Sequence, residues 1–509
     1  MYIKHLRFLL ALLFVVLTSC STLRKTPTPT VQTGKEAKRE FRGAWIQTAF
    51  QGEYKNMTPI EMKRSFIRKL NYLQACGINA IIFQVRPEAD AFYKSKLEPW
   101  SRFFTGEQGL APAGDFDPME FLIRECHKRN MEFHAWLNPY RASTAGQTKF
   151  AKGHVYHKHP SWFVTYNKQI LFDPGIPACR QFICQVVRDI VTRYDVDAIH
   201  MDDYFYPYPA AGMPFPDDKS FAKYGLKKGY TPSQRNDWRR ENVNTLIREL
   251  KRTILLTKPW VRFGISPFGI YRNKKSTPDG SGSNTNGLQN YDDLYADVTK
   301  WVKQGWIDYN MPQIYWEIGH PAADYITLIK WWNKNAYDRH LYIGQDVART
   351  MKIDQLTRKM RYERGLSKVK GNCFWPANEI LWNNHGVADS LKQHYHRYPA
   401  LIPAYTHLHN RAPKEVKKLK TRWTQHGFLL QWEAEQSANN PELASYFVIY
   451  RFKDNEPIDI GDPSKIVTTT RETSYLLPYE KGKVKYKYVV TAVDRFHNEN
   501  KGKVKKIKL

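Results

Sequence analysis

The stretch Val196–Pro207, VDAIHMDDYFYP, decides the fold because it joins an apolar run to an abrupt polar end. Mostly apolar residues lead to Met201, and Asp202, Asp203 and alternating tyrosines follow directly. A short apolar run of this kind is typical of a parallel strand that is covered on both faces. If this interpretation is right, the rest of the chain must contain further strands of the same type.

Seven other such runs alternate with amphipathic segments within residues 41–398. In chain order the eight runs are FRGAWIQT, INAIIFQVRP, EFHAWLNPYR, VDAIHMDDYFYP, VRFGISPFGIYR, DYNMPQIYWE, LYIGQDVAR and GNCFWPANE. The first intervening helix has a complete start signal, with Thr58 as the cap, Pro59 in the first turn and Glu61 closing a capping box. Eight strand–helix units predict an α/β fold, the (β/α)8 TIM barrel. A doubly wound open sheet is the alternative, but no Gly-rich phosphate loop follows the first strand.

The N-terminus has the features of an exported lipoprotein. A basic start precedes an apolar run from Leu9 to Leu17, which has the length of a signal peptide and is short for a membrane span. The run ends in LTSC, which resembles a lipobox, so residues 1–20 are predicted to be a lipoprotein signal with Cys20 as the lipidated residue. An uncleaved anchor and a plain secretory signal are the alternatives. Residues 21–40, rich in Thr, Pro and Lys, are predicted to be a flexible tether.

The composition limits the partners. A formal net charge of +29 would suggest nucleic acid in another setting. Export argues against nucleic acid, so an anionic envelope polymer or lipid headgroups fit better, with a solvated charged face as the simplest alternative. The cysteines other than Cys20 are odd in number and form no CxxC pair, which argues against a disulfide framework and against a zinc site.

The C-terminal part differs in pattern from the barrel. Residues 399–412, PALIPAYTHLHNRA, are predicted to be a linker after the barrel domain of residues 41–398. Beyond it, strand-like runs such as ASYFVIYRF and VKYKYVVTAVDRF follow one another without helices. Residues 413–509 therefore predict a small all-β sandwich of the fibronectin type III kind. We expect it to act as a spacer, or to contact a glycan or an envelope protein partner.

Polar and aromatic residues gather at the carboxyl ends of the predicted strands, where TIM barrels keep their sites. They are Gln84, Arg86, Asn138, Tyr140, Asp202, Asp203, Ser266, Gln313 to Glu317, Gln345, Asp346, Asn378 and Glu379. Stability alone would not place polar residues at this end of so many strands. The sequence therefore predicts a functional site at this mouth of the barrel.

Several long motifs closely resemble the glycosyl-hydrolase-like 10 family. They are FRGAWI, GINAIIFQVRPEADAFYKSKLEPWSRFFTGEQG, HKRNMEFHAWLNPYR, LFDPGIPACRQFI, YDVDAIHMDDYFYP and MPQIYW, and the resemblance covers roughly residues 40–400. It implies a TIM-barrel glycosidase of bacterial envelopes. Members of the family include enzymes that cleave peptidoglycan glycan strands stripped of their stem peptides. One departure is Ala198, where the family pattern has a glycine, a small change that should not disturb the site.

Glycoside hydrolysis usually needs two carboxyl groups. Side chains alternate along a strand, so His200 and Asp202 share one face while Asp203 lies on the other. Related barrel glycosidases keep a nucleophilic aspartate at this strand end, which favours Asp202 as nucleophile or general base. Asp203 is expected to bind substrate or brace the loop, and the two would exchange roles if the strand bends there.

The general acid is predicted to be Glu317, at the end of the sixth strand. Its neighbours Tyr315 and Trp316 would raise the pKa of its carboxyl group by desolvation. Glu88 and Asp346 are competitors, and each of these three residues is as compatible with a loop salt bridge or a helix cap. Sequence gives no distance between carboxylates, so retaining and inverting mechanisms both stay open.

The predicted substrate contacts are polar, cationic and aromatic. One of Arg86 and Arg141 is expected to pair with an aspartate of the site, and the other to receive the lactyl carboxylate of a muramic acid. Aromatic faces are expected to stack on sugar rings. The predicted substrate-binding residues are Gln84, Arg86, Glu88, Trp136, Asn138, Tyr140, Arg141, His200, Tyr204, Gln313, Tyr315, Trp316 and Asp346.

Other chemistries fit less well. His200 and the two aspartates supply metal-ligand types, but the first strand has no H-x-H pair and His134 lies too early in the third strand. No G-x-S-x-G elbow supports a nucleophilic serine, and no cofactor is expected. The sequence thus predicts an envelope glycosidase, lipid-anchored and placed at the outer membrane, that acts on peptidoglycan or a related amino-sugar or acidic polysaccharide. A non-catalytic glycan-binding lipoprotein and a partner-binding envelope protein are the alternatives.

Overall fold

The computed structural model describes residues 36–509 apart from residues 56, 145, 148 and 480. The predicted signal segment with Cys20, and most of the predicted tether, lie outside the described residues. Within the described ranges, no helix has the length and apolar character needed to cross a membrane.

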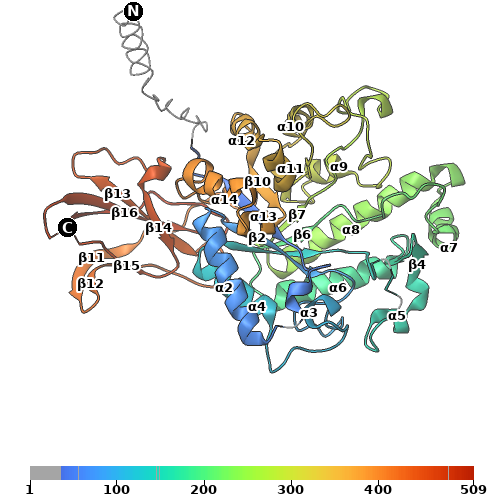
Figure 1. Ribbon diagram of the computed structural model, residues 1–509, viewed down its shortest axis with the longest axis horizontal. Coiled ribbons are helices and arrows are strands. Elements are labelled where there is room, and N and C mark those ends of the chain that lie inside the picture. Colours follow the sequence, from blue (N-terminus) through green and yellow to red (C-terminus); the bar gives the residue numbers. More distant parts are fainter. Residues whose placement is uncertain (1–35, 56, 145, 148, 480) are drawn as a thin grey trace, which may run out of the picture. The chain divides into compact units, whose positions relative to one another are not determined.

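Eight parallel strands form a closed barrel, which confirms the predicted fold class (Figure 1). The strands are β1 (Phe41–Ile46), β2 (Ala80–Arg86), β3 (Glu132–Leu137), β6 (Ala198–Met201), β7 (Arg262–Ile265), β8 (Tyr309–Asn310), β9 (His340–Asp346) and β10 (Val369–Trp375). Their order around the ring is β1-β10-β9-β8-β7-β6-β3-β2, and β1 pairs in parallel with β10. Because the ring closes, the open-sheet alternative is excluded.

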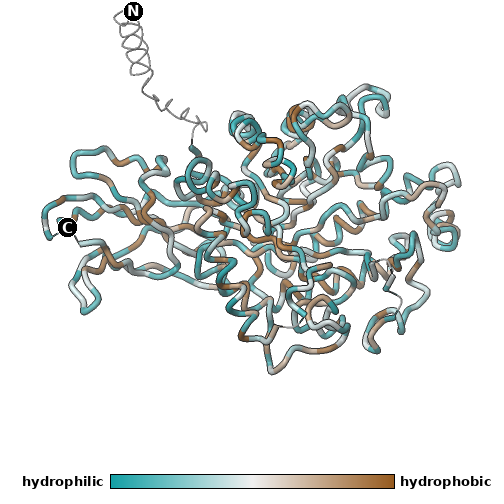
Figure 2. The backbone as a smooth tube through the Cα atoms, viewed as in Figure 1, coloured by the Kyte–Doolittle hydropathy of each residue, from teal (hydrophilic) through white to brown (hydrophobic). Residues whose placement is uncertain are grey.

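The barrel strands follow the predicted alternation of side chains. In β6, Ala198 belongs to an interior cluster that also contains Trp45, Trp136 and Tyr309. Ile199 and Met201 instead join the larger cluster beneath the helices. Both faces of these strands are buried, which explains why their sequences are mostly continuous apolar runs (Figure 2).

Helices follow the barrel strands and cover the outside of the ring (Figure 1). The longer helices are α2 (Pro59–Ala75), α4 (Pro118–Lys128), α6 (Pro177–Arg193), α8 (Arg235–Thr257), α10 (Tyr325–Lys334) and α12 (Leu356–Arg364). Two short helices, α9 (Val298–Lys303) and α11 (Val347–Lys352), also follow barrel strands. The predicted capping box of α2 is present, with the Thr58 amide donating to the Glu61 carboxylate over 2.8 Å. The long loop between β3 and α6 contains a hairpin, β4 (Phe163–Tyr166) and β5 (Gln169–Phe172), on the mouth side of the barrel.

The C-terminal region forms two antiparallel sheets, as predicted for an all-β part. One contains β11 (Lys417–Thr424), β12 (Gly427–Glu433) and β15 (Ser474–Leu476), and the other contains β14 (Ile466–Thr470), β13 (Tyr446–Lys453), β16 (Lys485–Val493) and β17 (Lys503–Lys508). Buried side chains from both sheets, among them Leu430, Phe447 and Val490, form a common core. The fibronectin type III assignment and the domain boundaries stay predictions.

Candidate active site

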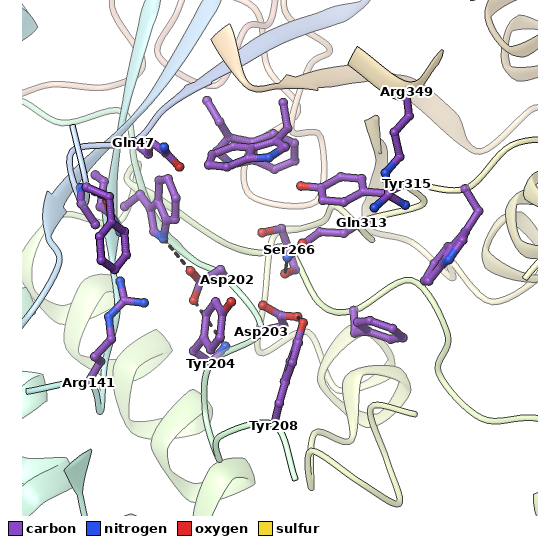
Figure 3. Close-up of a pocket in the computed structure, with 18 residues that line it drawn as sticks. Gln47, Arg141, Asp202, Asp203, Tyr204, Tyr208, Ser266, Gln313, Tyr315 and Arg349 are labelled. Carbon is purple, nitrogen blue, oxygen red and sulfur yellow. Dashed lines mark hydrogen bonds between the residues drawn. The ribbon is translucent and has the colours of Figure 1, made fainter. Parts of the chain in front are cut away.

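A cavity of about 490 Å³ opens at the carboxyl ends of the barrel strands (Figure 3). This volume lies within the usual range for small-molecule sites. The structure brings together these predicted residues in its wall: Asp202, Asp203, Gln84, Trp136, Arg141, Tyr204, Gln313, Tyr315 and Trp316.

Both aspartates reach the cavity because β6 ends at Met201 and the chain bends at Asp203. His200 keeps the inward direction of the strand and is fully buried in the barrel. A continued strand would have turned Asp203 toward the helices. The bend instead puts both carboxylates on the cavity wall, where Figure 3 shows them side by side.

Asp202 is held by a chain of hydrogen bonds across several strand ends. Its Oδ2 accepts from Asn138 Nδ2 at 2.6 Å and from Trp136 Nε1 at 3.1 Å, and its Oδ1 accepts from the Tyr204 amide at 3.3 Å. Asn138 Oδ1 in turn accepts from Gln84 Nε2 at 2.7 Å. This chain fixes the orientation of the Asp202 carboxylate.

The net effect of the surroundings is to raise the pKa of Asp202, although its partners offset part of the effect of burial. Burial raises the pKa of this carboxyl, and the Arg141 guanidinium, followed by the donors from Asn138, Tyr204 and Trp136, opposes that rise. Charge-assisted hydrogen bonds of this kind stabilise the ionised form. Arg141 is itself oriented by donating to the Pro87 carbonyl at 2.8 Å and to Asn138 Oδ1 at 2.7 Å.

Asp203 has different donors, among them the Gln313 side chain. Its Oδ2 accepts a short hydrogen bond from the Tyr208 hydroxyl. Burial, followed by the charge of neighbouring Asp202, raises the pKa of Asp203 to about 7. Two adjacent carboxyls with unlike partners are suited to different roles, because the pKa of Asp203 lies near neutral pH and Asp202 is next to a guanidinium.

The wall opposite the aspartates is aromatic and cationic. In the ring order, β6 lies across the barrel from β10, which contributes Trp375. Gln47 follows β1, and Arg349 lies on α11 after β9 (Figure 3). The Tyr315 hydroxyl, which follows β8, points into the cavity in Figure 3 and hydrogen-bonds to no other described residue.

Several predicted substrate contacts have structural partners away from the cavity wall. Arg86 is fully buried and donates through Nε and Nη2 to the Glu98 carboxylate, with an Nη2–Oε1 distance of 2.6 Å. Glu88 accepts from Arg102 Nε at 2.7 Å. Asp346 caps α11 by accepting from the Arg349 amide at 2.9 Å.

The remaining predicted residues lie near the cavity without lining it. Asn138 and His200 support it from behind, whereas Tyr140 is buried beside the β4–β5 hairpin, where its carbonyl accepts from the Phe172 amide at 2.8 Å. Glu317 follows Trp316 but is not part of the cavity wall. The roles assigned to these residues from sequence stay predictions.

Sequence reasoning missed about half of the wall. The missed residues are Trp45, Gln47, Ala49, Phe50, Tyr208, Phe268, Arg349 and Trp375, whereas Ser266 was predicted at the mouth without a specific role. Trp45 and Trp375 lie within the predicted strand runs, where the alternation of side chains could have shown that they point inward. Tyr208 and Phe50 lie in loops, where no periodicity gives a direction. No group of three or more His, Cys, Asp or Glu side chains within the described ranges has an arrangement that could hold a metal ion.

Comparison with known proteins gives consistent matches. The profile described as "Glycosyl hydrolase-like 10" matches residues 40–359. The chain is 40% identical over 485 residues to glycosyl hydrolase YngK of Bacillus subtilis (strain 168), covering 92% of this chain and 93% of the relative. It is 37% identical over 320 residues to glycosyl hydrolase DigH of Escherichia coli (strain K12), covering 59% of this chain and 71% of the relative. Among solved structures, the PgaB (BpsB) glycoside hydrolase domain from Bordetella bronchiseptica has a TM-score of 0.47 at 11% identity, covering 70% of this chain and 98% of that one.

Proposed function

The chain belongs to the glycosyl hydrolase-like 10 family, and we propose that it is an active glycosidase that cleaves peptidoglycan glycan strands free of stem peptides, or a related amino-sugar or acidic polysaccharide. Family membership supports a glycoside hydrolase-type function. Catalytic turnover by this chain and the identity of its substrate are what we propose. The observation that carries the proposal is the pair of buried carboxylates in the cavity, with surroundings that separate their protonation states.

The two aspartates have complementary roles in this proposal. Asp202, with three hydrogen-bond donors and Arg141, supplies the negative charge that stabilises an oxocarbenium-like transition state. Asp203 holds a proton near neutral pH and protonates the leaving glycosidic oxygen. Asp203 is a better acid candidate than Glu317, because Glu317 does not border the cavity.

The cavity wall suits an acidic amino-sugar polymer. Indole rings of Trp136, Trp316 and Trp375 offer apolar faces on which sugar rings stack. Arg141 and Arg349 bring positive charge to the same cavity and fit an acidic substituent such as the lactyl carboxylate of muramic acid. A neutral polysaccharide would make no use of this positive charge.

The cellular setting is part of the proposal and rests on sequence features alone. We place the protein on the bacterial cell envelope, anchored by a lipid at Cys20, at the outer membrane and facing the periplasm or the surface. The basic C-terminal region, with lysines along β11 and β17, is proposed to contact envelope glycan or an envelope protein partner.

The test is incubation of the purified protein with glycan strands that an amidase has freed of stem peptides, followed by measurement of new reducing ends and mass analysis of the products. We expect cleavage by the wild type and a loss of about 100- to 10,000-fold in Asp202→Asn and Asp203→Asn. The matched control is Asp115→Asn, because the Asp115 side chain is 95% exposed and lies away from the cavity. Binding of the strands without any cleavage would overturn the enzymatic proposal and favour a glycan-binding role.

A further inference from the structure

The two carboxylates of the cavity come from one wall. Asp202 and Asp203 are consecutive residues at the end of β6, and consecutive Cα atoms lie only about 3.8 Å apart. Within the described part of the chain, no other Asp or Glu lines the cavity. Gln47, Tyr315 and Arg349 lie on the other side (Figure 3). Trp375 at the end of β10, across the ring from β6, also lines the cavity, and none of these four residues has a carboxylate.

This arrangement is unsuited to the usual mechanism with two protein carboxylates. In that mechanism the carboxyl groups flank the scissile bond, about 5–5.5 Å apart in retaining enzymes and about 6.5–9.5 Å apart in inverting ones. A sugar ring bound in this cavity would have both carboxylates on the same side, with aromatic and amide groups opposite. The described protein residues therefore supply an acid and an anion, but no carboxylate on the far face to attack the anomeric carbon or to activate water there.

Resting on the proposed function, we propose that the nucleophile belongs to the substrate: the carbonyl oxygen of the 2-acetamido group of the sugar attacks its own anomeric carbon. The acetamido nitrogen on C2 and the leaving oxygen on C1 are attached to neighbouring ring atoms. Two consecutive aspartates can reach both of these groups from one strand end. Asp202 then accepts a hydrogen bond from the acetamido N–H, and Asp203 protonates the leaving oxygen.

The contacts of the two aspartates agree with this division. Asp202 is fixed by Asn138, Trp136 and the Tyr204 amide, so its negative charge is held where the acetamido nitrogen becomes positive. Asp203 is bound on one oxygen by the Tyr208 hydroxyl. The Gln313 side chain also hydrogen-bonds to this carboxyl group. The carboxyl borders the cavity, where it can reach the leaving glycosidic oxygen.

Tyr315 is the positioning group that this mechanism requires. Its hydroxyl faces the cavity from the end of β8 and has no hydrogen-bond partner in the described ranges. Donation from this hydroxyl to the acetamido carbonyl would hold the carbonyl oxygen under the anomeric carbon. Holding the reacting atoms in this way converts the attack into a pre-oriented intramolecular step.

The bonds and protons balance over the cycle. The proton of Asp203 passes to the glycosidic oxygen as the bond from C1 to that oxygen breaks, and the bond from C1 to the acetamido oxygen forms, giving an oxazolinium ion beside the Asp202 carboxylate. Water then attacks C1 on the face that the leaving group vacated and gives a proton to Asp203, and the ring opens to restore the acetamido group. One water is consumed, and the configuration at C1 is retained.

The test compares peptide-free glycan strands with the same strands after chemical N-deacetylation, and adds N-acetylglucosamine-thiazoline, a sulfur analogue of the cyclic intermediate. We expect cleavage at least about 100-fold slower at deacetylated sugars, and competitive inhibition by the thiazoline. In Tyr315→Phe, kcat should fall about 10- to 100-fold with little change in KM, whereas a merely structural Tyr315 would lower the unfolding midpoint and leave kcat unchanged.

The outcomes separate the mechanism from the function. Equal cleavage of acetylated and deacetylated strands, or mass-spectrometric trapping of a covalent glycosyl adduct on a carboxylate, would overturn the mechanism and leave the glycosidase proposal standing. Absence of cleavage of any strand by the wild type would overturn both.

Discussion

Asp203→Asn should stabilise the protein at neutral pH while it abolishes activity. Asp203 is 2% exposed, and burial together with the charge of Asp202 raises its pKa from 3.8 to about 7. Below about pH 4 the aspartate is protonated in the folded and the unfolded chain alike, and the folded protein has its full stability. As the pH rises toward 7, the unfolded chain releases this proton while the folded chain retains it, so the free energy of unfolding falls.

The size of this loss follows from the pKa difference. One pH unit corresponds to about 1.4 kcal/mol, so ionisation of Asp203 in the folded state costs up to about 4 kcal/mol once the pH exceeds 7. Asn cannot ionise and escapes this cost, but it accepts a weaker hydrogen bond from Tyr208, which offsets about 1–2 kcal/mol. We expect Asp203→Asn to be more stable than the wild type by roughly 2 kcal/mol at pH 8.

The assay is urea unfolding followed by tryptophan fluorescence, at pH values from 4 to 8. The stabilisation of Asp203→Asn should be absent at the acidic end and should grow toward neutral pH, whereas Asp115→Asn, with its exposed carboxylate, should show no such growth. A difference that is the same at both ends of the range would refute the reasoning, as would a variant less stable than the wild type at pH 8.

Three further predictions follow from the same contacts. The plot of kcat/KM against pH should be bell-shaped with its alkaline limb near pH 7, because Asp203 must keep its proton, and a flat profile from about pH 6 to 9 would contradict this role. Asn138→Ala should lower kcat by about 100-fold, since it frees the Asp202 carboxylate to rotate, and should also lower the unfolding midpoint, since it removes the acceptor of the Gln84 amide; wild-type kcat in this variant would show that the hydrogen bond to Asp202 is dispensable. Arg86→Met should cost about 3–5 kcal/mol of stability by leaving Glu98 buried without a cation, and adding Glu98→Gln should recover part of it; a loss of activity with no loss of stability would instead place Arg86 at the substrate.

The barrel was predictable because eight strand-like runs alternate with amphipathic segments along the sequence. The runs that contain β1 and β6 are buried on both faces, and burial of this kind leaves a continuous apolar pattern in the sequence. The β4–β5 hairpin was not predicted. Its turn residues Asn167 and Lys168 both have positive φ, of 44° and 62°, and the pair lacks the Gly that usually announces such a turn.

Residues of the candidate site could be predicted only within strands, where the alternation of side chains shows which of them point into the barrel. Asp202 could be placed inside the barrel from the alternation of side chains along β6. The position of Asp203 depends on a bend in the chain that the residue types at this point do not predict. The partners of Arg86 and Glu88 are Glu98 and Arg102, which lie in the segment between β2 and α4. The path of the chain after β2 determines which residues form ion pairs with Arg86 and Glu88. This path could not be predicted from a single sequence.

The buried histidine beneath the aspartates adds no positive charge to the site. His200 Nε2 lies 3.3 Å from Trp45 Nε1, and an indole N–H can only donate, so this imidazole nitrogen accepts and the ring is neutral. Its Nδ1–H then donates to the Tyr309 hydroxyl at 2.9 Å. Burial also lowers the pKa of His200 well below its usual range. A protonated imidazole at this position would lower the pKa of the nearby carboxyl groups, whereas the neutral ring does not oppose the rise that burial causes in the pKa of Asp203.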